Sequence, residues 1–235
     1  MTGVARGPAA LLALEDGTIL RGTGFGAEGE TFGEAVFNTA MAGYQEVLTD
    51  PSYSRQIVVM TSPHQGNYGT NAEDPESGLI RVAGFAVREA SRRASSWRAE
   101  RTLHEALAEA GVVAIEGIDT RRLTLRLRER GAMRAAVSTT DLEPASLVER
   151  VGREPGMEGA DLAAGVSVPE PYEARALVGP ASSERGEVFR VAAFDFGLKR
   201  NILRLLAASG CATTVFPATT PPADVAVRRF DGVFL

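Results

Sequence analysis

The sequence predicts an α/β protein built in two unequal parts. In residues 1–140, short apolar runs typical of buried strands alternate with segments whose leucines recur at helical spacing. Residues 188–235 follow the order strand, helix, strand, helix, strand, which begins a doubly wound parallel sheet. Residues 141–187 are interrupted by prolines and are expected to form a connecting region. The length of 235 residues suits one large domain or two ordinary ones.

Composition and charge narrow the class of protein. Hydrophobic residues make up 44% of the chain and charged residues 23%, which is typical of a globular protein. The net charge of −5 argues against nucleic acid as a partner. One cysteine excludes an internal disulfide framework, and with two histidines it leaves little for a zinc site. The apolar run Ala9–Leu14 is too short for a signal peptide or a membrane span, so we expect a cytoplasmic protein without a membrane partner.

The chain is expected to open with a hairpin. Ala9–Leu14 reads as a strand, the Asp-Gly pair at residues 16 and 17 favours a tight turn, and Ile19–Gly22 is the return strand. The run from Gly22 to Gly29 superficially resembles a phosphate-binding loop. Such a loop needs a following helix whose N-terminus faces the phosphate, and the residues after Gly29 do not open one. We interpret the run as a glycine-rich turn between strands.

The stretch from Gly33 to Gly69 is the densest in turn residues, aromatics and polar side chains. Ala35–Phe37 and Ile57–Met60 are predicted to be buried strands. Between them, Thr49–Ser54 is expected to lack regular structure, because Pro51 has no N–H and disfavours a helical residue before it. The side chains of residues 50, 52 and 54 can bond nearby backbone, so the segment is predicted to be a fixed turn.

The remaining elements of both parts follow from apolar periodicity and from capping residues. The helix that starts at Asp119 or Thr120 has Leu123, Leu127 and also Leu125 assigned to its apolar side. The predicted elements are a strand at 79–87, a helix through 103–110 ended by Gly111, a strand at 112–115, the helix from 119 or 120 ended by Gly131, a strand at 133–137, a short helix at 146–151, a strand at 188–194, a turn at 195–197, a helix at 199–208, a strand at 213–216, a helix at 223–228 and a strand at 232–235.

The last predicted strand ends the sequence, at the edge where doubly wound sheets bind ligands. We expect the chain to stop within this fold. A sheet of so few strands exposes an edge and an uncovered face, although parallel sheets normally have helices on both faces. Residues 188–235 are therefore expected to be poorly protected from hydrogen exchange unless a partner covers them.

Seven short motifs carry a resemblance to a known family. They are Leu14–Thr18, Phe37–Thr39, Gly43–Glu46, Leu48–Ser54, His64–Asn67, Ile118–Arg121 and Phe194–Ile202, and they occur in the family's order. The chain resembles the small, glutamine-hydrolysing subunit of carbamoyl-phosphate synthetase. The resemblance implies the N-terminal domain of that subunit at 1–140, the connecting region at 141–187, and at 188–235 an incomplete class I glutamine amidotransferase domain with a flavodoxin-like sheet.

The resemblance also implies an activity. In this family a cysteine on a strand–turn–helix elbow attacks the side-chain amide of L-glutamine, and a histidine and a glutamate complete the triad. Ammonia passes through an internal tunnel to the large subunit, where it joins bicarbonate and ATP to give carbamoyl phosphate for arginine and pyrimidine synthesis. The resemblance implies no cofactor in the small subunit, since ATP and magnesium are expected in the large one.

The catalytic elbow of the family lies beyond the counterpart of Leu235, so no catalytic residue is assigned in this chain. Cys211 follows a helix-ending glycine and opens a strand, so we interpret it as a small packing residue. His64 and His104 cannot replace the missing base without a nucleophile to serve. The resemblance therefore implies that the chain alone does not hydrolyse glutamine.

Ser52 is the one site residue that the resemblance assigns. In the family the serine of the Asp-Pro-Ser-Tyr-Ser segment contacts the bound glutamine, and a hydroxyl can donate to its carboxylate or accept from its ammonium. The alternative is a turn serine that bonds its own backbone. Lys199 and Arg200 open a helix, where they either serve an interface, pair with acids, or are solvated. Asp119–Arg121 is interpreted chiefly as a helix N-cap and first turn, with use at an interface left open.

Two functions of different class remain. The first is a subunit of an enzyme, the glutamine-binding part of a glutaminase that works with the large subunit. The second is a non-catalytic module that docks on the large subunit.

Overall fold

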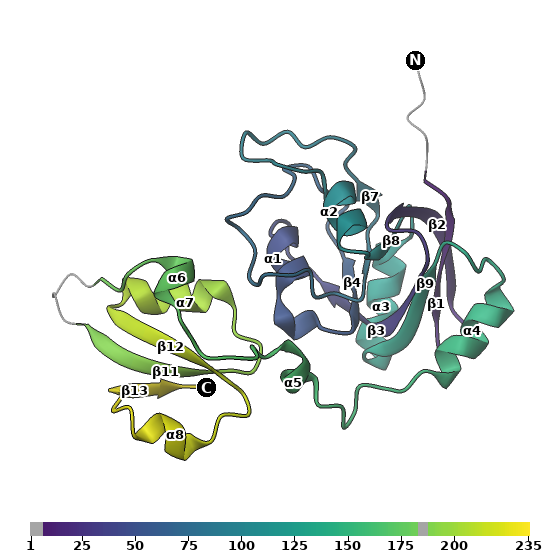
Figure 1. The fold of residues 1–235 in the computed structure, drawn as a ribbon. Coiled ribbons are helices and arrows are strands. Elements are labelled where there is room, and N and C mark those ends of the chain that lie inside the picture. The colour runs from purple at the N-terminus through teal and green to yellow at the C-terminus, as the bar shows by residue number, and fades with distance from the viewer. Residues whose placement is uncertain (1–6, 183–187) are drawn as a thin grey trace. The chain divides into compact units, whose positions relative to one another are not determined.

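The computed structural model describes residues 7–182 and 188–235. The fold class is α/β, as predicted, and the chain divides into two compact units, Met1–Glu158 and Gly159–Leu235 (Figure 1). The boundary falls inside the segment 141–187, which was expected to connect the two parts. The described part of this segment, residues 141–182, carries three helices and a short strand.

Unit 1 is built on a closed barrel with the strand order β1-β2-β8-β6-β4-β3-β9. The neighbours β3, β4, β6 and β8 run parallel in turn, and the remaining pairs are antiparallel. A separate pair joins β5 (His64–Gln65) to β7 (Glu89–Ala90). The barrel strands are β1 (Ala9–Leu14), β2 (Ile19–Gly26), β3 (Glu30–Asn38), β4 (Gln56–Met60), β6 (Gly84–Ala86), β8 (Val113–Glu116) and β9 (Met133–Ser138).

The helices of unit 1 begin and end largely where local chemistry predicts. In α2 (Leu103–Glu109), the Thr102 hydroxyl accepts from the Glu105 N–H while the Glu105 carboxylate accepts from the Thr102 N–H. The Asp119 carboxylate caps α3 (Thr120–Arg130), which Gly131 ends with a positive φ. The other helices are α1 (Tyr44–Thr49), the 3₁₀ turn η1 (Pro51–Tyr53) and α4 (Pro144–Arg153).

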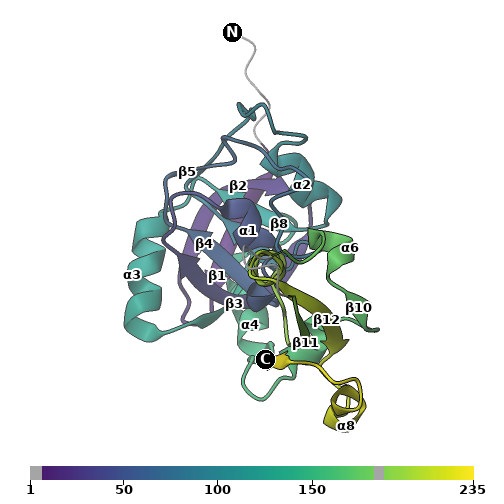
Figure 2. The ribbon, with the colours of Figure 1, turned by 90° about the vertical axis from the view of Figure 1, so that its left-hand side faces the viewer.

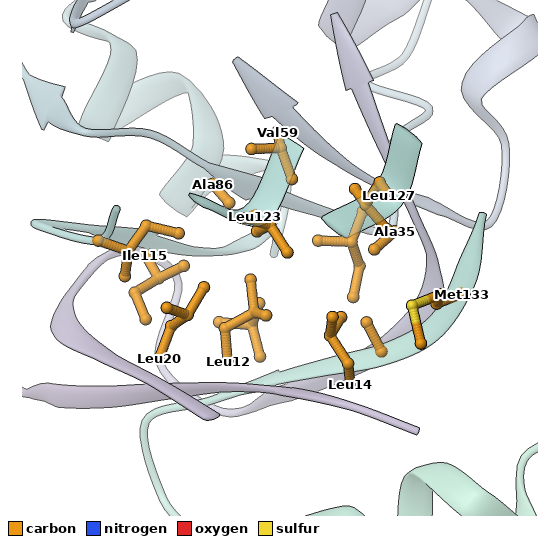
Figure 3. Close-up of a cluster of buried hydrophobic side chains, with 14 of the residues drawn as sticks. Leu12, Leu14, Leu20, Ala35, Val59, Ala86, Ile115, Leu123, Leu127 and Met133 are labelled. Atoms are coloured by element: carbon orange, nitrogen blue, oxygen red, sulfur yellow. The ribbon is translucent and has the colours of Figure 1, made fainter. Parts of the chain in front are cut away.

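The core of unit 1 follows from the alternation of side chains along each barrel strand. Leu12 and Leu14 of β1 point into the barrel, where Leu123 and Leu127 of α3 join them (Figure 3). The intervening side chains of β1 pack instead against α4, whose Leu147 is fully buried. Burial of a leucine side chain stabilises the fold by about 1.5–3 kcal/mol. Because both faces of β1 are covered, its sequence is apolar throughout.

The glycine-rich run was predicted to be a turn, and that prediction is wrong for most of its length. Strand β2 continues through Gly26, so the run turns only at residues 27–29. A Cβ placed at Gly22 would lie 2.2 Å from the Glu116 carbonyl oxygen of the neighbouring strand β8. Glycine is therefore needed here for close approach of two strands rather than for turning.

Two further expectations differ from the structure. The strand expected at 79–87 is reduced to β6, the three residues 84–86. Leu125 was assigned to the apolar side of α3, yet its side chain is 46% exposed. Residues two apart on a helix point in different directions, so Leu125 cannot share the buried face of Leu123 and Leu127.

Unit 2 has a sheet with the order β10-β12-β11-β13. Strand β11 (Phe189–Asp195) lies between β12 (Cys211–Pro217) and β13 (Gly232–Phe234) and is parallel to both, while β10 (Tyr172–Glu173) is antiparallel to β12. Both faces carry apolar clusters, one with Leu203 of α7 and one with Val225 of α8, so the expectation of an uncovered face is wrong. The helices are α5 (Leu162–Val166), α6 (Arg175–Val178), α7 (Arg200–Ala208) and α8 (Pro222–Ala226).

An ionic cluster fastens α4 to the barrel. The Glu30 carboxylate of β3 accepts hydrogen bonds from Arg150 Nη2 at 2.9 Å and from the Ser138 hydroxyl at 2.8 Å. Arg150 also pairs with Asp141, and its guanidinium lies 5.5 Å from the centre of the Phe32 ring. The hydrogen bond from Arg150 lowers the pKa of Glu30 from 4.5 to about 2, although partial burial opposes the shift.

We predict that Glu30→Gln lowers the free energy of unfolding by about 1–2 kcal/mol at neutral pH, allowing for solvent screening. The folded-state pKa of Glu30 is depressed, so its stabilisation is complete above the unfolded value of 4.5 and is lost as the pH falls toward about 2. The difference between the wild-type chain and the variant should therefore shrink with acidification. Urea unfolding from neutral pH to about pH 3 measures it.

Glu28→Gln is the matched control, because Glu28 precedes the same strand and is exposed. We expect this variant to differ little from the wild-type chain at any pH. A deficit in Glu30→Gln that stays constant as the pH falls would contradict a role for the ionised carboxylate.

We also predict that residues 188–235 exchange amide hydrogens faster than the barrel of unit 1. Strand β13 lies at the edge of its sheet, and the Val233 side chain is 61% exposed. Edge strands with exposed side chains open at a low free-energy cost. Hydrogen-exchange mass spectrometry checks this, and equal protection of the two units would contradict it.

Candidate functional site

The site residue assigned from the sequence, Ser52, lies in η1 between α1 and β4. The Asp50 carboxylate accepts a hydrogen bond from the Ser52 N–H at 2.9 Å, and the Ser54 N–H donates to the Pro51 carbonyl at 3.1 Å. The segment is a fixed turn, as predicted, but the expectation that it lacks regular structure is wrong. Proline fits the first position of a helical turn, where its missing N–H would have no partner.

The Ser52 side chain is exposed on this turn. Among residues 7–182 and 188–235, the structure gives its hydroxyl no hydrogen-bond partner. Asp50, rather than Ser52, satisfies the backbone of the turn. The geometry thus leaves the serine hydroxyl available to donate to or accept from a ligand.

The turn is anchored to the barrel on both sides of Ser52. Tyr53 accepts a hydrogen bond at its hydroxyl from Asn38 Nδ2, at the end of β3, at 3.0 Å. Arg55 has a φ of 62°, a left-handed conformation that non-glycine residues rarely adopt. Its carbonyl accepts from the Glu34 N–H at 3.1 Å, and a Cβ at Gly33 would lie 2.5 Å from the same oxygen. These contacts hold Arg55 in a strained backbone conformation directly after the turn.

Helix α1, which was not predicted, supports the turn from the other side. Its first residue, Tyr44, is fully buried and stacks on Tyr68 with the ring centres 4.3 Å apart. The Tyr44 hydroxyl donates to the Gly69 carbonyl at 2.6 Å, and the Tyr68 hydroxyl accepts from the Gly43 N–H at 2.6 Å. Burial raises the pKa of both tyrosine hydroxyls, so both stay protonated at neutral pH.

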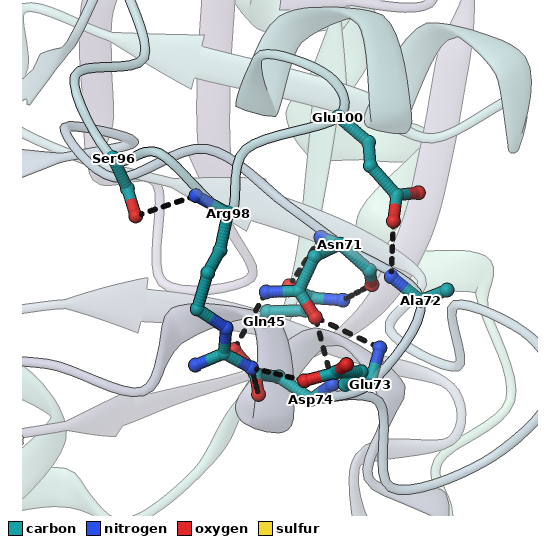
Figure 4. Close-up of polar contacts among 8 residues, drawn as sticks. All are labelled: Gln45, Asn71, Ala72, Glu73, Asp74, Ser96, Arg98 and Glu100. Carbon is teal, nitrogen blue, oxygen red and sulfur yellow. Dashed lines mark hydrogen bonds and ion pairs between the residues drawn. The ribbon is translucent and has the colours of Figure 1, made fainter.

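A polar network ties α1 to the long excursion that follows β4 (Figure 4). The side-chain amide of Gln45 exchanges two hydrogen bonds with the backbone of Asn71, at 2.5 and 3.0 Å. Asp74 accepts from Asn71 Nδ2 at 2.7 Å and from Arg98 at 2.6 Å. These contacts close the loop at residues 71–74 over α1.

One carboxyl of this region has a perturbed acidity. Burial raises the pKa of Glu46, and the negative charges of Asp74 and Glu76 raise it further. The motif Gly43–Glu46 does not predict this shift, because the charges around Glu46 come from a segment some thirty residues later.

Among the described residues, each histidine has its own polar partner, and neither is bonded to the cysteine. His104 Nδ1 accepts a hydrogen bond from the Gly26 N–H at 2.9 Å, and His64 Nδ1 lies 3.8 Å from Glu89. Cys211 is partly buried at the first position of β12, in the other unit. Among the described residues, no hydrogen bond joins either histidine to a cysteine or serine side chain.

The turn after β11 is organised by a buried carboxylate. Asp195 Oδ1 accepts from the N–H groups of Gly197 and Leu198 at 3.0 and 2.7 Å, and its Oδ2 accepts from the Val168 N–H at 2.9 Å. The predicted tight turn is therefore confirmed. Lys199 follows as the N-cap of α7 and Arg200 is its first residue. An aspartate at the end of an apolar strand, followed two residues later by glycine, is the sequence signal of such a turn.

The described residues contain no group of three or more His, Cys, Asp or Glu side chains that could hold a metal ion. None of the helices in the described parts of the chain combines the length and the apolar composition needed to cross a membrane. Ser52 with its supporting turn is thus the candidate site of unit 1.

Comparison with known proteins gives a family. The domain family described as "Carbamoyl-phosphate synthase small chain, CPSase domain" matches residues 12–137. The carbamoyl phosphate synthase small chain of Syntrophotalea carbinolica is 49% identical over 233 residues, which cover 96% of this chain and 61% of that protein. The small chain of Thioalkalivibrio sulfidiphilus is 48% identical with the same coverage, and that of Pseudomonas putida is 49% identical over 96% of this chain and 62% of its own length.

The chain thus spans about three fifths of the length of these relatives. The matched residues include the whole barrel apart from parts of β1 and β9, and they include the turn that bears Ser52. The chain belongs to the carbamoyl-phosphate synthase small chain family.

Proposed function

We propose that this chain contributes the glutamine-contacting N-terminal part of a glutamine amidotransferase subunit. In this role the subunit releases ammonia from L-glutamine and supplies it to the large subunit of carbamoyl-phosphate synthase. The large subunit binds ATP and magnesium and makes carbamoyl phosphate for arginine and pyrimidine synthesis in the cytoplasm. The family match and the exposed Ser52 hydroxyl support this proposal.

Ser52 is the residue on which the proposal depends. Its hydroxyl is exposed, and its own turn is satisfied by Asp50, so a ligand carboxylate or ammonium meets a free hydrogen-bonding group. The anchored backbone on both sides fixes the position of the serine before a ligand arrives. Preorganisation of this kind reduces the entropic cost of binding.

Unit 2 is proposed to be the beginning of the amidotransferase domain. The order β12-β11-β13 places the first parallel strand between the second and the third, which is the order in which flavodoxin-like sheets begin. In such sheets ligands bind at the carboxyl ends of the strands. The Asp195 turn lies at that end of β11.

The alternative function is a non-catalytic module that docks on the large subunit. Cys211 favours it for the chain taken alone, because this cysteine starts a strand and no histidine of the described residues bonds it. The two functions differ in one measurable property, the release of ammonia from glutamine.

We predict that the 235-residue chain alone releases no ammonia from L-glutamine above the uncatalysed rate. The physical reason is that a thiol without a base and an oxyanion site is a weak nucleophile toward an amide. A coupled ammonia assay checks this, with the full-length small chain of Pseudomonas putida as the positive control. Ammonia release that disappears in Cys211→Ser would contradict the prediction and make Cys211 a nucleophile.

A second prediction tests Ser52 in a complete subunit. Residues 1–235 replace the matching segment of the Pseudomonas putida small chain, and Ser52→Ala is introduced into this chimera. Loss of one hydrogen bond to a charged group costs about 1.5–3 kcal/mol, so the KM for glutamine should rise about 10- to 100-fold. The kcat should fall much less, because the hydroxyl contacts the substrate outside its reacting amide.

Ser54→Ala is the matched control, since it removes a hydroxyl from the same turn two residues away. We expect its KM to remain near the value of the unmodified chimera. An unchanged KM in Ser52→Ala, or equal increases in both variants, would remove Ser52 from the glutamine site.

A further inference from the structure

The outer side of α3 carries an exposed leucine among arginines. Leu125 is 46% exposed near the middle of the helix. Its neighbours on the helix surface are the residues three and four positions away, namely Arg121, Arg122, Arg128 and Glu129, all of which are exposed. We call Arg121, Arg122, Leu125 and Arg128 the α3 face. Figure 2 shows α3 at the periphery of unit 1, beside the barrel strands.

The α3 face opens onto a hollow in the surface. A cavity of about 550 Å³ lies between α3 and the hairpin of β1 and β2, and Arg121, Arg122 and Leu125 line it together with Leu20 and Thr18. The side chain of Leu125 therefore has free space beside it. A partner side chain can enter this space and bury the leucine.

The arginines of this face are not used by the fold. Arg126, on the same helix, pairs with Asp16 and holds α3 to the hairpin. Within the part of the chain that the structure describes, the guanidinium groups of Arg121, Arg122 and Arg128 make no ion pair or side-chain hydrogen bond. Their charges stay available for an outside group.

The local charge is opposite to that of the whole chain. Helix α3 contains five arginines and one glutamate, which gives it a charge of +4, whereas the chain has a net charge of −5. Arginine matches the planar geometry of a carboxylate with two parallel hydrogen bonds. Three arginines and one glutamate, Glu129, surround the apolar centre, so the rim is net positive. Such a rim is complementary to an acidic protein segment that bears an apolar residue.

We propose that the α3 face docks an acidic segment of the carbamoyl phosphate synthase large chain. Leu125 is buried at the centre of this contact, and the three arginines pair with carboxylates around it. The inference rests on the proposed function, because that function supplies the large chain as the partner. The family resemblance by itself assigns no such role to this helix.

The test measures the affinity of the chain for the large chain by isothermal titration calorimetry. We expect Arg121→Glu with Arg122→Glu to weaken binding at least about tenfold, since like charges then face the acidic segment. These positions lie in the first turn of α3, where acidic residues are favoured by the helix dipole, so the helix stays folded. Circular dichroism verifies this. Leu125→Ala should weaken binding about threefold or more.

Arg88→Glu with Arg93→Glu is the matched control. Both residues are exposed in unit 1 outside α3, and the substitution changes the net charge by the same amount, from −5 to −9. We expect the control to bind like the wild-type chain. Equal weakening of binding in the two double variants would overturn the proposed docking role of the α3 face, because the total charge would then explain the loss of affinity.

The results also separate this inference from the proposed function. If the wild-type chain binds the large chain and the α3 variants bind equally well, the α3 face is not the docking surface. The proposed partnership with the large chain then stands. If the wild-type chain does not bind at all, the proposed partnership fails and the α3 face fails with it.

Discussion

The parallel pairing of β3 with β4 is the constraint on which the candidate site depends. Two parallel neighbours cannot be joined by a hairpin, so the chain must return along the whole length of β3 before β4 begins. Residues 39–55 make that return outside the barrel, as α1 followed by η1. The register pairs Asn38 with Met60, and Asn38 also donates to the Tyr53 hydroxyl. The sheet pairing that closes the barrel therefore also fixes the turn that presents Ser52.

Burial of Tyr44 explains why such a short crossover helix is stable. An isolated helix of six residues does not form in water, because nucleation is unfavourable and its few hydrogen bonds do not compensate for that cost. Tyr44 is fully buried, stacks on Tyr68 and bonds the Gly69 carbonyl, while Gln45 bonds the backbone of Asn71. The long excursion after β4 thus folds back onto α1 and supports it. Support of the site comes from contacts that are distant in sequence.

This dependence on distant contacts decides what the sequence can predict. Asp119 and Gly131 bound α3 by local capping chemistry, so the helix was predicted almost to the residue. Helix α1 was missed because its stability comes from the excursion, and Gly22 of β2 was misread because its cause is the close approach of β8. The fixed turn around Ser52 was predicted from Asp50 and Pro51, whereas its ligand came from resemblance alone. No local sequence pattern predicted that the strands of unit 1 close into a barrel.

The free energy of a single hydrogen bond limits how much Ser52 can contribute to glutamine binding. A hydrogen bond to a charged ligand group contributes about 1.5–3 kcal/mol, whereas even a millimolar dissociation constant corresponds to about 4 kcal/mol. Ser52 alone therefore cannot hold glutamine, and the proposed function requires further groups that bind its reacting amide and its α-substituents. The exposure of Ser52 is compatible with the proposed function, because a hydroxyl that completes a site formed mainly by other residues has to stand clear of its own fold. In the proposed function the turn supplies the position of the hydroxyl, and most of the binding free energy has to come from other groups.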